Sequence, residues 1–171
     1  TSGGGFVVAW MEQTGFEIYG QRYDASGAPD GDHFHVNTAT ESWQRFPSVA
    51  SLNDGEFVVT WHSDLAADAI YGQCFDASGN HKGDEFQVSI PSYIYDPASN
   101  TISETDRPNH VDPNSQADWA KHQVIGLDDG GFVVTWGEGY SEVYGQRFDS
   151  SGTPTGDNFH VSQVGSSSRT P

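Results

Sequence analysis

The sequence predicts an all-β fold built from three four-stranded antiparallel units. Two observations predict it: one pattern occurs three times, and inside each copy short runs of alternating apolar and polar residues are separated by turn formers. The copies read GGFVVAW, GEFVVTW and GGFVVTW, and continue as IYGQRYD, IYGQCFD and VYGQRFD. Repeats of about 50 residues are typical of stacked or radially arranged structural units.

Each strand can be justified in order from the middle copy. Residues 46–52 (FPSVASL) form a short first strand, and NDG at 53–55 signals a tight turn because Gly accepts a positive φ. Residues 56–62 form a second strand whose Phe, Val and Trp share one face. Residues 69–76 form the third strand and 85–89 the fourth. Such a meander sheet cannot bury both faces alone, so we expect the units to pack on one another.

The units occupy about 1–40, 41–90 and 118–165 of a single all-β domain spanning 1–171. An inserted segment at 91–117 holds four of the eight prolines and no sustained period, so we expect a long surface loop there.

The first unit lacks its own first strand. The sequence ends in RTP, which matches RFP at 45–47, so the C-terminus could supply the missing strand and complete a ring. The alternative, that the chain is a slice of a longer array, stays open.

Charge and composition narrow the function classes. A net charge of −17, from 24 acidic and 7 basic residues, repels phosphate backbones and argues against nucleic-acid binding. No apolar run approaches the ~20 residues that span a bilayer, so we expect no membrane span. Cys74 is the only cysteine, which rules out an intramolecular disulfide.

The repeated pattern G-G-F-V-V-x-W, Y-G-Q-R-[FY]-D-x-S-G and G-D-x-F-x-V resembles repeat modules of large secreted bacterial haemolysin-type and adhesin-like proteins. The resemblance covers nearly all of the chain outside the insertion, and it departs where Cys74 replaces the arginine found at Arg22 and Arg147. The glycine-rich calcium nonapeptide that often accompanies such proteins is absent.

The resemblance implies β-propeller-like blades with approximate threefold pseudo-symmetry, and an extracellular or cell-surface location. A β-prism is the alternative architecture. Because three blades are few for a propeller, a second copy of the chain could complete the ring as a homo-oligomer.

Aromatic rings and variable loops suggest where a ligand binds. Trp10, Trp61 and Trp136 are either sugar platforms or core, and their apolar strands favour core. The residues after each tryptophan differ between units, as expected of binding loops on a constant scaffold. The predicted ligand-binding residues are Glu12, Gln13, His62, Asp64, Glu138, Tyr140 and Trp119.

Two groups of residues could bind a metal ion. The aspartates that flank each DASG-type turn could bind Ca²⁺ but also form Asx turns without metal, and the turn interpretation is favoured. His33 and His35 could share a metal, but an exposed polar face is the better account. The sequence therefore requires no cofactor, with Ca²⁺ as the open option.

The sequence favours a non-enzymatic function. It contains no H-E-x-x-H, G-x-S-x-G, P-loop or dinucleotide-binding motif. We expect an extracellular carbohydrate-binding module of the lectin or adhesin type, with multivalent shallow glycan sites. The alternatives are a structural repeat of a bacterial surface protein and a polysaccharide-degrading enzyme.

Overall fold

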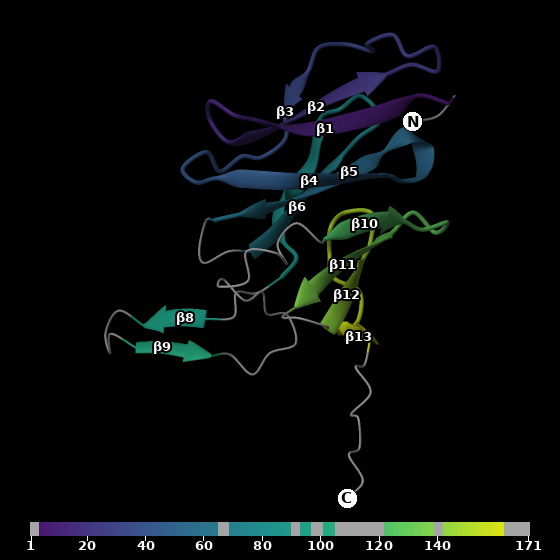
Figure 1. The fold of residues 1–171 in the computed structure, drawn as a ribbon. Coiled ribbons are helices and arrows are strands. Elements are labelled where there is room, and N and C mark those ends of the chain that lie inside the picture. The colour runs from purple at the N-terminus through teal and green to yellow at the C-terminus, as the bar shows by residue number, and fades with distance from the viewer. Residues whose placement is uncertain are drawn as a thin grey trace, which may run out of the picture.

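Three antiparallel sheets follow one another along the chain in the computed structural model (Figure 1). Each sheet takes its strands in sequence order, so every unit is a meander. The structure describes residues 4–64, 69–89, 93–96, 101–104, 122–138 and 142–162. The predicted all-β fold in antiparallel sheets is confirmed.

The first sheet has three strands and the other two have four. The first contains β1 (Phe6–Glu12), β2 (Glu17–Tyr23) and β3 (Phe34–His35). The second contains β4 (Gln44–Ser51), β5 (Phe57–Ser63), β6 (Ala69–Phe75) and β7 (His81–Gln87). The third contains β10 (Gln123–Gly126), β11 (Phe132–Glu138), β12 (Glu142–Phe148) and β13 (Phe159–Ser162).

The first sheet has no counterpart of β4 and β10 in the described ranges. The predicted pairing of the C-terminus with this sheet falls on residues 163–171, which lie outside the described residues. Among those that are described, the three sheets do not close into a ring. The threefold propeller or prism arrangement stays a prediction.

The pairing register gives every sheet two different faces. In the second sheet Phe57 pairs with Phe75 and Trp61 with Tyr71, so these rings lie on one face. The first and third sheets have the same register. We call this side the Trp face, which in the first sheet carries Phe6, Val8, Trp10, Tyr19, Gln21 and Tyr23. The other side is the reverse face, which in the first sheet carries Val7, Ala9, Met11, Ile18, Phe34 and Val36.

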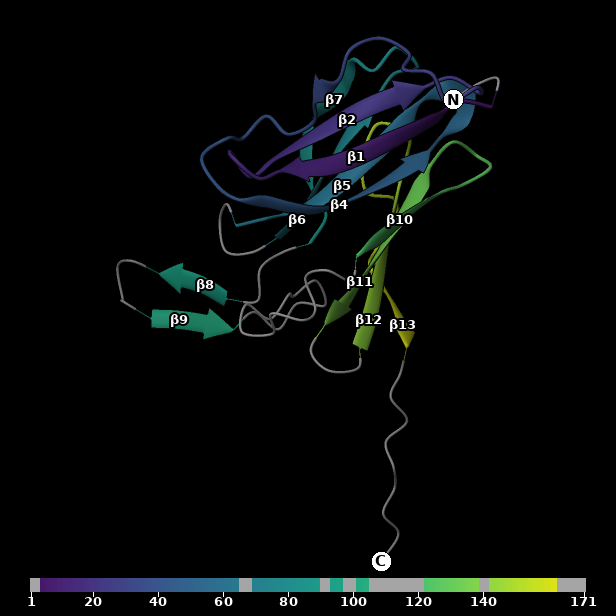
Figure 2. The same cartoon turned by 45° about the horizontal axis from the view of Figure 1, so that its top comes forward.

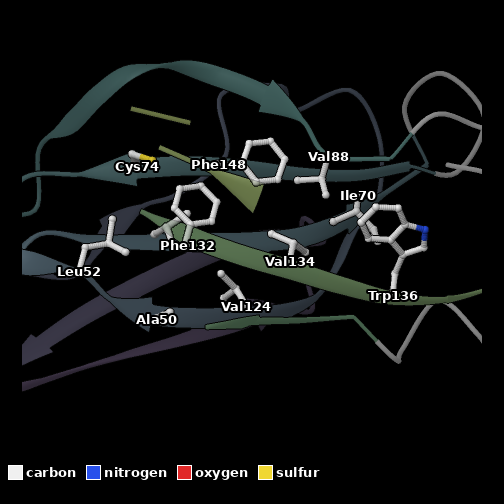
Figure 3. Packing of buried hydrophobic residues seen from close by; sticks show 11 residues of the cluster. Ala50, Leu52, Ile70, Cys74, Val88, Val124, Phe132, Val134, Trp136 and Phe148 are labelled. Atoms are coloured by element: carbon white, nitrogen blue, oxygen red, sulfur yellow. The ribbon is translucent and has the colours of Figure 1, made fainter. Parts of the chain in front are cut away.

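The reverse face of each sheet covers the Trp face of the next. One core cluster joins Ile18 and Val36 of the first sheet to Phe57, Val59, Trp61 and Phe75 of the second. The other joins Val58, Ile70 and Val88 of the second sheet to Phe132, Val134, Trp136 and Phe148 of the third (Figure 3). Trp61 and Trp136 are fully buried, which confirms the core interpretation for these two rings.

A phenylalanine in the last strand of each sheet explains the glycine of the YGQ motif. Phe86 folds over Gly72, and a Cβ at that glycine would lie 2.5 Å from the ring. Phe34 over Gly20 and Phe159 over Gly145 repeat the arrangement, at 2.5 and 2.6 Å. Real Cβ atoms do not approach a ring so closely, so the motif needs glycine for space.

We expect Gly72→Ala to lower the free energy of unfolding by about 1–3 kcal/mol, because Cβ forces the Phe86 ring out of its place. Chemical denaturation measures the loss. Gly72→Ala combined with Phe86→Leu should recover part of it, since the smaller side chain makes room. A Gly72→Ala variant as stable as the wild type would contradict this explanation.

The last strand is shorter in the first and third sheets than in the second. Pro29 and Pro154 each form a single isolated bridge, with Tyr23 and Phe148. The second unit has His81 at the matching position, and β7 begins there, earlier than predicted. Proline lacks the N–H that a ladder requires, which accounts for the difference.

The turns follow the predicted chemistry. Asp54 and Gly55, in the 3₁₀ turn η1 (Asn53–Gly55), have φ of 57° and 82°, as the NDG signal requires. In the DASG-type turns Asp24, Asp76 and Asp149 each accept backbone N–H bonds from residues two and four positions later, at 2.8–3.0 Å. These aspartates form Asx turns, which is the interpretation that the sequence favours.

The insertion departs from the loop predicted for 91–117. β8 (Tyr93–Asp96) and β9 (Thr101–Glu104) pair as an antiparallel hairpin, which lies apart from the three sheets in Figures 1 and 2. Tyr and Ile favour strands, but the prolines of the segment masked this local signal. The described ranges contain no helix that is long and apolar enough to cross a membrane.

Candidate functional site

The Trp face of the first sheet has no sheet packed over it in the described structure, and a hollow lies on this face. Trp10, Glu12, Tyr19 and His33 line the hollow, whose volume is about 270 Å³. β1 contributes Trp10 and Glu12, which are two residues apart and therefore on the same side of the strand. Tyr19 is the cross-strand partner of Trp10 on β2.

The rings form an aromatic wall. Trp10 and Tyr19 have centroids 6.3 Å apart and planes inclined by 23°. Tyr19 also meets His33 edge-on at 5.8 Å and stacks with His35 at 4.9 Å. Three ring types therefore present faces and edges to one shallow space.

Carboxylates give the hollow a negative border. The Glu12 carboxylate accepts hydrogen bonds from the Thr14 hydroxyl and from the Gly15 N–H, at 3.2 Å. These bonds, the Thr14 hydroxyl first, hold the pKa of Glu12 below its ordinary value, so the carboxylate is ionised at neutral pH. Beyond it, Glu17 pairs with His35 at 3.1 Å.

The matching positions of the other units are closed. The side chains of Trp61 and Trp136 lie in the cores between sheets. Trp61 Nε1 donates to Gln44 Oε1 at 2.9 Å, so even its polar edge is satisfied internally. Among the described tryptophans of the repeat, Trp10 alone is accessible to a ligand.

The predicted site residues fall in different places. Glu12 lines the hollow, and Gln13 is exposed in the turn that follows β1. Glu138 is the last residue of β11, and its side chain lies outside the described part of the structure. Tyr140 and Trp119 also lie outside it. The ligand-binding role of these residues stays a prediction.

The structure brings His62 and Asp64 together, although not on an open surface. His62 is fully buried, with Nδ1 3.6 Å from Asp64 Oδ1. Asp64 forms an ion pair with Arg45, whose guanidinium lies 4.7 Å from the centre of the Trp43 ring. His62 points from the reverse face of the second sheet, so a ligand on the Trp face cannot contact it.

Burial decides the charge of His62. Desolvation lowers its pKa to about 4; the Asp64 carboxylate opposes this shift, and Arg45 and His122 add to it. His122 is also buried and precedes β10 of the third sheet. The histidine is thus neutral at pH 7 and belongs to the junction of two sheets.

Sequence reasoning did not assign Trp10, Tyr19 and His33 to the site. From the sequence, a sugar platform is one interpretation of Trp10 but core is favoured, and His33 is interpreted as part of an exposed polar face in preference to a metal site. Whether Trp10 is accessible depends on which neighbouring sheet packs on the Trp face. A repeated sequence pattern does not predict this, because it is nearly the same in all three units. Within the described ranges, no three His, Cys, Asp or Glu side chains are grouped to hold a metal ion.

Compared with known proteins, the chain matches no protein-family model and no curated protein.

Proposed function

We propose that this chain is an extracellular carbohydrate-binding module whose site is the hollow on the first sheet. The observation that supports the proposal best is the accessible pair of Trp10 and Tyr19 next to the ionised Glu12. Aromatic faces stack on the apolar C–H face of a sugar ring, while carboxylate and imidazole groups bond its hydroxyls. The hollow combines both kinds of group at one place.

The binding mode follows from the geometry. A sugar ring lies against Trp10 and Tyr19, Glu12 accepts hydrogen bonds from its hydroxyls, and His33 contacts it from the edge. A shallow site of this kind binds weakly, so useful avidity requires several sites. Because Trp61 and Trp136 are buried, multivalency requires several copies of the chain whose first sheets all stay uncovered.

The test begins with a glycan array probed with dilute protein, followed by calorimetry with the strongest glycan. We expect Trp10→Ala to weaken binding by about 5-fold or more, since stacking on a ring contributes about 1 kcal/mol. Glu12→Gln should weaken it less, because an amide still accepts one bond. Trp43→Ala is the tryptophan control, since Trp43 is exposed but does not line the hollow, and it should bind like the wild type.

If the protein binds no glycan on the array, or if it binds a glycan as tightly after Trp10→Ala, this proposal is wrong. Release of shortened products from the retained glycan would instead favour the polysaccharide-degrading alternative.

A structural repeat of a bacterial surface protein is the second candidate. The observation that favours it is the burial of Trp61 and Trp136, because repeats that cover one another's rings are built to stack. In that reading the sheets are blade-like units of a propeller or prism. A folded protein that retains no glycan would favour this candidate over the first.

A further inference from the structure

The two ends of the three-sheet stack expose different faces. At one end lies the Trp face of the first sheet, where Phe6 is 46% and Val8 41% exposed. The matching residues of the second sheet, Phe57 and Val59, are fully buried because the first sheet covers them. Phe6 and Val8 are thus core positions that no sheet covers in the described part of the chain.

At the other end lies the reverse face of the third sheet. Ile125, Phe159 and Val161 are 60%, 43% and 53% exposed. Their counterparts in the second sheet are Ala50, Phe86 and Val88, which belong to the core against the third sheet or pack on it. The third sheet therefore exposes its reverse face, the kind of surface that covers a neighbouring sheet inside the chain; we call it the covering end. The first sheet exposes its Trp face, the kind of surface that is covered inside the chain; we call it the receiving end.

Two contacts inside the chain show how the reverse face of one sheet packs on the Trp face of the next. Phe34, on the reverse face of the first sheet, packs on the stacked rings of Phe57 and Phe75, with centroids 5.9 and 5.2 Å away. Phe86 of the second sheet packs on Phe132 and Phe148 in the same way, at 5.9 and 5.3 Å. A phenylalanine in the last strand of one sheet thus completes a three-ring cluster in the next.

The receiving position also includes a turn glycine. Gly79 lies against Arg22 and Phe34 of the preceding unit, and Gly152 lies against Phe86. The matching Gly27 of the first unit has only open space at its Cβ position. Beside it Phe6 and Tyr23 are already stacked, with centroids 5.0 Å apart and planes inclined by 12°. The first sheet holds two of the three rings and the empty place for the third.

An arginine contact also joins the first unit to the second, although Cys74 replaces the arginine at the next junction. Arg22 donates to the carbonyl of Ala77 in the turn of the next unit. Arg147 stands at the same position of the third unit and is exposed. On a further unit, the carbonyl that matches Ala77 is that of Ala25.

We propose that the reverse face of the third sheet of one copy covers the Trp face of the first sheet of a second copy. Phe159 takes the place over Phe6, Tyr23 and Gly27 that Phe34 and Phe86 take inside the chain, and Arg147 reaches the Ala25 carbonyl. The two surfaces differ, so the contact is heterologous and continues head to tail until a ring closes or a filament forms.

This association goes beyond the proposed glycan binding and does not depend on it. It also competes with it, since a covering sheet buries Trp10 as Trp61 and Trp136 are buried. A sugar in the hollow should therefore favour free chains, and association should weaken sugar binding by the same factor.

Sedimentation velocity, without sugar, tests the proposal from about 10 μM to about 1 mM protein. The wild type should form larger species as its concentration rises. Phe159→Asp blocks the covering end and Phe6→Asp the receiving end, so each variant alone should stay a monomer. An equimolar mixture of the two should form a dimer and stop there, because it retains one intact pair of ends.

Val161→Asp and Val8→Asp repeat the experiment at neighbouring exposed positions, and melting curves confirm that each variant is folded. Phe46→Asn is the matched control, since it removes an exposed ring away from both ends and should associate like the wild type. Added salt should strengthen association, because it screens repulsion between chains of charge −17.

A wild type that is monomeric over the whole range would overturn the proposal. So would association that survives both charged substitutions, or a mixture that stays monomeric. None of these results bears on whether dilute protein retains a glycan, so the two proposals can fail separately.

Discussion

Phe57→Ala is expected to lower the free energy of unfolding by about 3–5 kcal/mol, whereas Phe6→Ala should cost about 1 kcal/mol or less. The two residues occupy the same position of the repeat. Phe57 is fully buried under the first sheet, so its loss leaves a cavity in the core. Phe6 is half exposed, and its loss removes mainly its stacking on Tyr23.

Urea denaturation at a concentration where the chain is monomeric measures both losses. Domains are stable by only about 5–15 kcal/mol, so Phe57→Ala removes a large share of the stability. Phe132→Ala is the internal check, because Phe132 is buried by the second sheet as Phe57 is by the first, and it should resemble Phe57→Ala. Equal losses at Phe6 and Phe57 would contradict the order in which the sheets cover one another.

The sequence could not predict which sheet packs on which face of its neighbour. Alternation placed Phe57, Val59 and Trp61 on one face, and the observed register confirms it because strand periodicity is a local property. Which neighbour covers that face depends on contacts between units. Three nearly identical patterns do not distinguish Trp10, which is accessible, from Trp61, which is buried.

His62 shows the same limit within one strand. The sequence placed it at the end of the strand 56–62 and counted it among the variable residues after Trp61, and β5 continues to Ser63. One residue past a tryptophan lies on the reverse face, and two residues past lies on the Trp face. His62 is therefore buried against the third sheet, while Glu12, two residues after Trp10, lines the hollow.

Two structural differences between the units have causes that are visible in the sequence, although the sequence analysis did not predict them. Pro29 and Pro154 were present in the sequence where the second unit has His81, and proline chemistry alone accounts for the shorter ladders of the first and third units. The hairpin of β8 and β9 was hidden because its four-residue strands are too short to give a sustained period.

Acid should loosen the junction between the second and third sheets through His62. Its pKa is about 4 in the folded chain and about 6.5 when unfolded, so the unfolded chain binds more protons between these values. Stability is therefore complete above about pH 6.5, falls as the pH is lowered toward 4, and changes no further below that through this group. The loss amounts to about 3 kcal/mol.

Comparing variants at pH 7 and pH 4.5 isolates this contribution from the titration of the many carboxylates. His62→Gln removes the ionisable ring, so its free energy of unfolding should fall by less between the two pH values than that of the wild type. His33→Gln is the control, because His33 is exposed, and it should keep the wild-type difference. The burial of His62 beside Arg45 and His122 requires this contrast. An identical pH response in His62→Gln and the wild type would mean that the histidine ring is hydrated and that the two sheets do not seal it.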